Sequence, residues 1–137
     1  MHIAVERLTA ILILVTALSH VTAAGAWARL FERIRASGET AGLLNAFMHL
    51  PLGAVIVVSH DVWTWPAVIV TVFGWALVIK GTLQLLFPAL AQRSLALAGE
   101  GETAEWRYRT AGVVMFLYGL GVASIAWGYP TSWSMPF

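Results

Sequence analysis

The sequence predicts an all-α integral membrane protein, a four-helix bundle with a short interfacial helix after the first span. Two observations predict this class. Of the 137 residues, 59% are hydrophobic and only 11% are charged, whereas soluble domains carry about 25% charged residues. The apolar residues also gather into four long stretches. So short a chain cannot bury all this apolar surface in its own core, so lipid must cover the remainder.

The four spans are expected within a single transmembrane domain covering residues 1–137. They run over residues 4–26, 41–59, 66–87 and 109–128. Each is close to the roughly 20 residues that cross a hydrocarbon core. The alternative for the first is a cleaved signal peptide, because residues 8–18 resemble its hydrophobic region. Glu6 beside Arg7 cancels the positive charge that such a signal carries, which favours a retained helix.

Two longer connectors separate the spans. Residues 27–40 place four apolar side chains on one helical face: Trp27, Leu30, Phe31 and Ile34. This pattern predicts the interfacial helix, the alternative being a polar loop. Residues 89–108 mix arginine with glutamate and are expected to form a water-exposed loop, with residues 98–105 as its flexible part.

Prolines mark both ends of the third span. Pro66 suits its first turn, where a missing N–H costs nothing. Thr64 or Asp61 is expected to cap this helix with its side chain. Pro88 is expected to end the same helix, because proline cannot continue one.

The arginines predict the orientation. Six flank the two connectors: Arg29, Arg33, Arg35, Arg93, Arg107 and Arg109. The opposite side has Arg7 alone, so the connectors are expected in the cytoplasm and both termini outside it. Tryptophans near the ends of the apolar runs predict an aromatic belt, and the uncharged tail 129–137 is expected to lie along the outer interface.

Composition also excludes several functions. The chain has no cysteine, so thiolate metal sites and cysteine nucleophiles are excluded. Its net charge of +1 comes without a basic stripe, so nucleic acid is not an expected partner. Ser59, His60 and Asp61 are consecutive and cannot converge as a catalytic triad. No other nucleophile or phosphate loop is evident, so the chain is not expected to be an enzyme.

A polar layer is expected inside the membrane. Lys80 lies about eight residues, or roughly 12 Å, from the cytoplasmic end of its span. Counting along the other spans places three more polar side chains at a similar depth: His20, His49 and Tyr118. Asn45 and Gln84 lie one turn from His49 and Lys80 and extend the same faces. These six residues predict a centre that binds a small ligand or relays protons.

Structural explanations stand beside this hypothesis. Lys80 alone can snorkel toward the cytoplasm, and each histidine alone can be a hydrogen-bonded core residue. A second functional alternative is haem held by His20 and His49, with Lys80 near a propionate. A third is an accessory subunit of a larger complex, or a homo-oligomer, that packs through small-residue faces such as Gly119 with Ala123.

A second polar cluster is expected at the extracytoplasmic end. Its members are His2, Glu6, His60 and Asp61. Nitrogen and oxygen ligands of this kind suit a divalent metal, but they form only a weak candidate. Solvation by water and lipid headgroups is the favoured explanation.

Residues 60–88 resemble a pattern found in small uncharacterised bacterial four-helix membrane proteins. The matching elements are His60-Asp61-Val62-Trp63, Pro66, Thr71, Gly74-Trp75, Lys80-Gly81 and Pro88. Asp61 departs from the asparagine expected at that position. The resemblance extends over most of the four spans and implies a bacterial inner-membrane protein, without implying an activity.

Overall fold

The computed structural model describes residues 2–96 and 101–128 and is all-α over these ranges. Its helices are α1 (His2–Thr22), α2 (Ala24–Ala36), α3 (Thr40–Ser59), α4 (Val68–Leu86), α5 (Pro88–Ala96) and α6 (Gly101–Gly128). Four of them, α1, α3, α4 and α6, are long and apolar enough to cross a membrane. The predicted fold class is therefore confirmed, and the chain is a multi-pass membrane protein.

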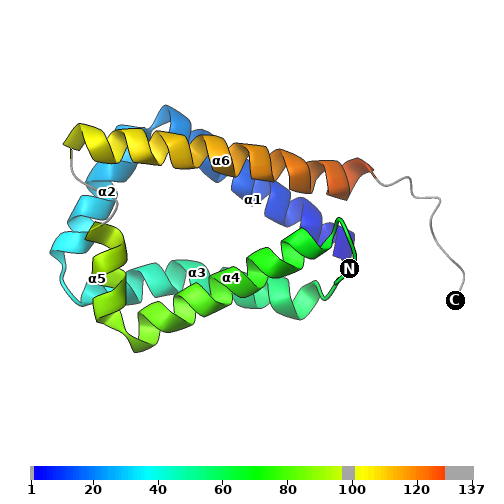
Figure 1. The fold of residues 1–137 in the computed structure, drawn as a ribbon, viewed down its shortest axis with the longest axis horizontal. Coiled ribbons are helices and arrows are strands. Elements are labelled where there is room, and N and C mark those ends of the chain that lie inside the picture. The colour runs from blue at the N-terminus through cyan, green and yellow to red at the C-terminus, as the bar shows by residue number, and fades with distance from the viewer. Residues whose placement is uncertain (1, 97–100, 129–137) are drawn as a thin grey trace, which may run out of the picture.

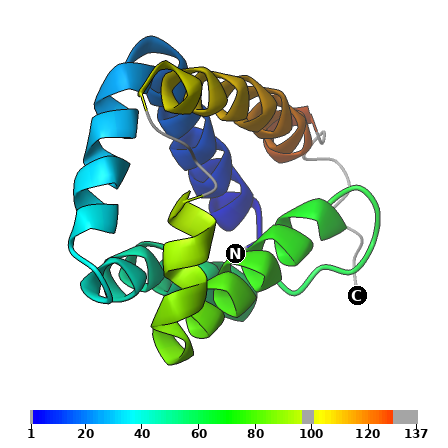
Figure 2. The same cartoon turned by 60° about the vertical axis from the view of Figure 1, so that its left-hand side comes forward.

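The spanning helices form two pairs. Helix α1 packs along α6, and α3 packs along α4 (Figure 1). The short helices α2 and α5 lie together at one end of the molecule, which we call the connector end (Figure 2). The start of α1, residues 60–67 and the end of α6 lie at the opposite end. Four crossings thus bring both connectors to one side, as the sequence predicts.

Glycines hold α1 against α6. A Cβ on Gly112 would lie 2.8 Å from the His20 Cβ and 2.9 Å from the Ala17 carbonyl oxygen. A Cβ on Gly119 would lie 2.9 Å from Leu14 Cδ2. Such close approach supplies the dispersion contacts on which helix association in lipid depends. The small-residue face of α6 is therefore used within the chain.

Three glycines do the same between α3 and α4. A Cβ on Gly74 would lie 2.5 Å from Ile56 Cγ2, and one on Gly81 would lie 2.8 Å from the Leu50 backbone nitrogen. Gly53 meets α4 equally closely, with the Val78 nitrogen 2.7 Å from the position of a Cβ. Neither the α1–α6 pair nor the α3–α4 pair can therefore accept larger side chains at these glycine positions.

The apolar core joins the two pairs at only one end. Its fully buried members come from all four spanning helices: Val5, Ala10, Ile56, Val70 and Val122. Elsewhere large apolar side chains point outward, with Phe47 71% and Leu117 64% exposed. In a bilayer these side chains face lipid. The pairs are thus held together next to residues 60–67 and separate toward the connector end.

The first connector is helical, as predicted, and begins earlier than expected. Helix α1 ends at Thr22 and α2 starts at Ala24, so the first span is shorter than residues 4–26. Helix α2 ends before Gly38, which has a φ of 66°. This left-handed conformation stops a helix and suits glycine, which has no Cβ to clash.

The prediction of a loop over residues 89–108 is wrong for residues 89–96 and 101–108, which are helical, and residues 97–100 lie outside the described residues. Pro88 begins α5, and α6 starts at Gly101 rather than at residue 109. Proline is favoured in the first turn of a helix as well as after its end. The alanines and leucines that follow are strong helix formers, and α5 buries Ala91 and Leu95. Glu105 and Arg109, one turn apart, form an ion pair that stabilises the polar first part of α6.

The start of the third span also differs from the prediction. Helix α4 begins at Val68, two residues after Pro66, and has no side-chain cap. Instead, the Thr64 carbonyl accepts the Val68 N–H at 3.0 Å. The Asp61 carboxylate accepts the indole N–H of Trp63. The prediction for the tail 129–137 lies outside the described residues.

Candidate functional site: a polar chamber between the helix pairs

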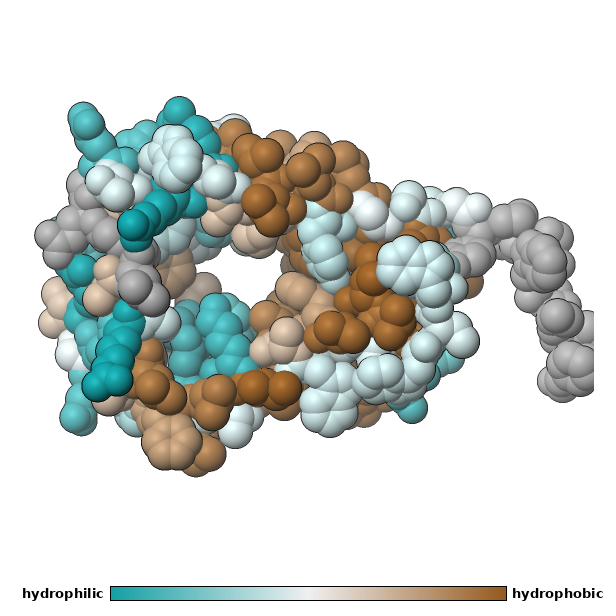
Figure 3. Space-filling view, viewed as in Figure 1, coloured by the Kyte–Doolittle hydropathy of each residue, from teal (hydrophilic) through white to brown (hydrophobic). Residues whose placement is uncertain are grey.

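A chamber of about 360 Å³ lies where the two helix pairs separate. All six helices contribute to its wall, and α2 and α5 lie at its connector end. Its main polar lining residues are His20, Asn45, His49, Lys80, Ser94 and Tyr108. Figure 3 shows an opening between the pairs that has hydrophilic surface beside it toward the connector end and hydrophobic surface on the other side.

Lys80 and His49 meet at the wall of the chamber. Lys80 Nζ lies 2.9 Å from His49 Nε2, joining α4 to α3. His49 Nδ1 lies 2.7 Å from the backbone carbonyl oxygen of Asn45, which can only accept a hydrogen bond. Nδ1 therefore donates, and Nε2 of the neutral imidazole accepts from the ammonium group. Helical spacing explains the geometry, since residues 45 and 49 are one turn apart.

Within residues 2–96 and 101–128, the charge of Lys80 has no counter-charge nearby. Lys80 lies about 9 Å from the connector end of α4, counted at 1.5 Å per residue from Leu86. Among the described residues, no carboxylate pairs with its ammonium group. A charge at membrane depth is unfavourable unless it pairs or meets water. The neutral His49 supplies a hydrogen bond but leaves the positive charge uncompensated.

Asn45 contributes an unused hydrogen-bonding group. Its side chain is only 4% exposed, and its Oδ1 atom has no partner among the described residues. Gln84, one turn from Lys80, is 5% exposed and its Oε1 atom likewise lacks a partner there. Buried polar atoms are nearly always satisfied in native proteins. These two acceptors flank Lys80 from α3 and α4 and point to a ligand or ordered water.

Aromatic side chains form the wall next to α2. His20 donates from Nδ1 to the Thr16 carbonyl at 2.9 Å, and its ring stacks on Trp27 with centroids 4.2 Å apart. Phe31 continues this stack to Tyr108, at 5.4 Å. These ring contacts join α1, α2 and α6 to one another. His20 itself is 9% exposed and presents Nε2 as an acceptor.

The structure assembles four of the six predicted site residues around this chamber: His20, Asn45, His49 and Lys80. Gln84 lies outside it, in a groove that shares Lys80. Tyr118 is further away, donating its hydroxyl to the Ile69 carbonyl at 2.9 Å and packing on the core. Counting residues gave its depth from a helix start at 109, whereas α6 begins at Gly101.

The lining residues that the sequence analysis did not assign to the site include Trp27, Phe31, Ser94 and Tyr108. Trp27 and Phe31 were assigned to a membrane interface, and Tyr108 and Ser94 to a loop that is in fact helical. A signal existed for Tyr108, which lies one turn before Gly112 on the face that packs against His20. Recognising that face as a helix contact places Tyr108 beside His20.

The second predicted cluster is buried at the opposite end. We call the contact of Glu6, His60 and Thr71 the junction, because it ties α1 to the start of α4. His60 Nε2 lies 3.1 Å from Glu6 Oε1, and His60 Nδ1 lies 2.9 Å from Thr71 Oγ1. The exposed fractions are 0% for His60 and 4% for Glu6. The expectation that water and headgroups solvate these two side chains is therefore wrong.

The other two members of that cluster do not complete a metal site. The His2 ring centroid is 5.9 Å from that of His60, and Asp61 turns toward Trp63. Within residues 2–96 and 101–128, no three histidine or carboxylate side chains are placed to share a metal ion. Glu6 and His60 satisfy each other instead, because an ordered loop carries His60 back under α1.

Comparison with family models, with curated proteins and with solved structures finds no match for this chain. The resemblance of residues 60–88 to small bacterial membrane proteins therefore stays a prediction. The function has to be inferred from the chamber itself.

Proposed function

We propose that this chain is a non-enzymatic membrane protein that binds a small anionic ligand in the chamber at Lys80. The observation that carries the proposal is the position of the Lys80 ammonium group. It lies at membrane depth, lines an open chamber, and has a neutral imidazole as its hydrogen-bond partner. An anionic ligand would supply the missing counter-charge.

The neighbouring residues support a ligand more than a purely structural network. A structural network of buried polar groups is usually satisfied throughout, because partly satisfied networks are unstable. Here Asn45 Oδ1 has no partner among the described residues, and the chamber volume of about 360 Å³ exceeds that of a single water molecule many times over. A ligand with an anionic group and a nearby hydroxyl or amine would satisfy both Lys80 and Asn45.

The experiment compares Lys80→Met with Arg109→Gln. Each variant removes one positive charge, but Arg109 lies outside the chamber in an exposed ion pair. Mass analysis of molecules that co-purify with the protein should show an anionic species with wild type and Arg109→Gln. Lys80→Met should lose it while keeping its thermal stability. If Lys80→Met lowers stability and leaves the bound molecules unchanged, the centre is structural and the proposal fails.

Haem binding is a second candidate, supported by the imidazole geometry. His20 and His49 both use Nδ1 for a backbone carbonyl. This tautomer is typical of histidines that hold a metal and leaves Nε2 as the ligand atom. In His20 that atom is available, whereas in His49 it accepts from Lys80, which would have to turn away for a haem to bind. An absorption spectrum of the purified protein decides between the candidates, because haem gives a Soret band that His49→Ala should abolish.

An accessory role in a larger complex has less support. The proposed packing faces of α6 and α1 are occupied within the chain, since Gly112 and Gly119 contact α1 directly. A stable particle of one chain or a few copies after purification would argue further against this role.

We also propose that the connector end faces the cytoplasm of a bacterial inner membrane. The six connector arginines support this orientation. The chain has no cysteine, so single substitutions give clean labelling sites. Ser37→Cys at the connector end should resist an impermeant thiol reagent in intact cells, and Thr64→Cys at the other end should react. The opposite pattern would reverse the orientation.

A further inference from the structure

An apolar groove opens from the chamber along α4. It has a volume of about 510 Å³ and is lined by residues of α4 and α5, among them Ile79, Leu83 and Leu90. These side chains are 55%, 43% and 45% exposed. Lys80 and Ser94 line both the groove and the chamber. Of the described lining residues of the chamber, Lys80 alone is a lysine, arginine or carboxylate, and it therefore lies at the mouth of a lipid-facing groove.

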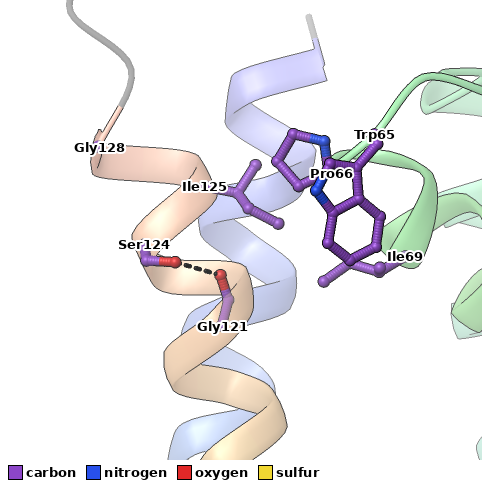
Figure 4. Close-up of a pocket in the computed structure, with 7 residues that line it drawn as sticks. All are labelled: Trp65, Pro66, Ile69, Gly121, Ser124, Ile125 and Gly128. Atoms are coloured by element: carbon purple, nitrogen blue, oxygen red, sulfur yellow. Dashed lines mark hydrogen bonds between the residues drawn. The ribbon is translucent and has the colours of Figure 1, made fainter.

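The apolar surface continues along α4 toward the junction. A second pocket of about 420 Å³ shares Ala76 with the groove and reaches Ile69 and Tyr118 between α4 and α6. A third, of about 370 Å³, shares Ile69 and ends at Trp65 and Pro66. Figure 4 shows these last two side chains facing Ile125 of α6. We call the three pockets together the α4 groove.

The part of the α4 groove between Lys80 and Ile69 matches one lipid chain in length. Lys80 and Ile69 are eleven residues apart, which is about 16 Å of helix. The hydrocarbon core of a bilayer is about 30 Å thick, so one leaflet contributes about 15 Å. A chain that starts at Lys80 can therefore lie along the groove with its end near Ile69.

The polar groups at the mouth define the head of such a ligand. Lys80 offers a positive charge without a carboxylate partner among the described residues. Asn45 and Gln84, each one turn toward the connector end, offer side-chain oxygens without a partner among the described residues, one in the chamber and one in the groove. A matching head carries an anionic group next to hydrogen-bond donors. A phosphodiester with a hydroxylated substituent has both.

We propose that the ligand of the chamber is an anionic phospholipid with a hydroxylated head, which enters sideways from the bilayer. Its phosphate lies on Lys80, its hydroxyls reach Asn45 or Gln84, and an acyl chain lies in the α4 groove. This inference rests on the proposed binding of an anion at Lys80. It adds the class of the ligand and its route of entry.

The test uses the full chain in nanodiscs of phosphatidylcholine with a minor fraction of phosphatidylglycerol. After mild delipidation, mass spectrometry measures which lipid stays bound. Wild type should retain phosphatidylglycerol selectively. Lys80→Met should lose the selectivity, and Ala76→Trp, which fills the groove between its first two pockets, should lose it as well. Ala111→Trp places the same side chain on an exposed position of α6 outside the groove and should behave as wild type.

A second arm separates this inference from the function on which it rests. Glycerol phosphate serves as a soluble probe with the same anionic group and hydroxyls but no acyl chain. Binding of this probe that depends on Lys80 and is unaffected by Ala76→Trp, with no selective retention of phosphatidylglycerol, would overturn the lipid and keep the anion site. Retention of phosphatidylcholine in preference to phosphatidylglycerol would also overturn the lipid proposal. If Lys80→Met changes the binding of neither phosphatidylglycerol nor glycerol phosphate, the proposed function itself fails.

Discussion

The junction and the chamber both pair a histidine with an ionisable side chain on another element, yet they differ in every other respect. At the junction, His60 has a partner on each ring nitrogen and no exposed surface. At the chamber, the Lys80–His49 contact faces open volume, and Asn45 beside it has an unused acceptor. The comparison teaches that intramembrane polarity has two uses. A satisfied pair fixes the helices, and an unsatisfied one leaves room for a ligand.

Surrounding structure reinforces the difference. The core residues Val5, Ile56, Val70 and Val122 join the two helix pairs next to the junction. The chamber lies where that core has ended, and stacked aromatic rings of α1, α2 and α6 line it. Regions with less packed apolar contact open more readily. We therefore expect the helix pairs to open and close about the junction.

The largest expected effect is the loss of the junction pair. Glu6→Ala leaves His60 fully buried without its carboxylate partner, and breaking a buried pair costs about 3–5 kcal/mol. Unfolding in mixed detergent should detect this loss. Asp61→Ala removes an exposed carboxylate of the same loop and should change little. If both variants are equally stable, the junction does not hold the pairs together.

The next effect tests the contact between α3 and α4. Gly81→Ala places a methyl group against the Leu50 backbone, which cannot move aside, so stability should fall by about 1–3 kcal/mol. The shift should also separate Lys80 from His49 and weaken ligand binding. Gly121→Ala on α6 is the matched control, because nothing lies within 4 Å of the added methyl group. Equal melting temperatures for the two variants would contradict the close packing.

The sequence predicts some features of this structure and not others. Composition predicted an integral membrane protein, because only lipid can solvate apolar runs such as residues 41–59. Helix rise placed Lys80 and His49 at one depth, and they do meet. A depth counted from an expected helix start fails where the helix begins earlier, so Tyr118 on α6, which starts at Gly101, contacts Ile69 instead. The rotation and tilt of each helix depend on how it packs against its neighbour, for example at Gly74 or Gly112. The sequence of one helix does not specify that packing.

Burial of the junction was hidden for a related reason. Glu6 lies near a helix end and His60 in a turn, where charged residues usually meet water or headgroups. Only the return of the loop under α1, with Thr71 bonding the Val62 carbonyl at 2.8 Å, encloses them. Long-range closure of this kind leaves no periodic signal in the sequence. Helix α5 was missed because Pro88 is equally suited to ending one helix and starting the next.

A smaller effect is expected when one hydrogen-bond partner is removed from the junction. Thr71→Val keeps the shape of a side chain that is 1% exposed but removes the hydroxyl bonded to His60 and Val62. Leaving buried partners unsatisfied costs about 1–3 kcal/mol. Chemical or thermal unfolding should place this variant between Glu6→Ala and wild type. A loss as large as that of Glu6→Ala would mean that the hydroxyl organises the junction as much as the Glu6–His60 contact does.

The effect on stability should be smaller still at the chamber. Lys80→Met replaces an uncompensated charge by an apolar side chain of similar length, and such exchanges are often neutral or stabilising. We expect a change within about 1 kcal/mol in stability, together with loss of the bound anion. His49→Ala should also spare the fold and weaken binding. A large destabilisation by both would give the chamber the same structural role as the junction and remove the contrast.

The smallest effect concerns a charge pair that lies outside both regions. Arg109 and Glu105 form an ion pair at 3.1 Å on α6, with side chains 57% and 44% exposed. Exposed pairs one turn apart contribute about 0.3–0.5 kcal/mol, so Arg109→Gln should unfold almost as wild type does and keep the chamber ligand. This variant matters because it removes the same formal charge as Lys80→Met. If it too released the bound anion, the anion would be held by the overall positive charge of the connector end, and Lys80 would have no special place in binding.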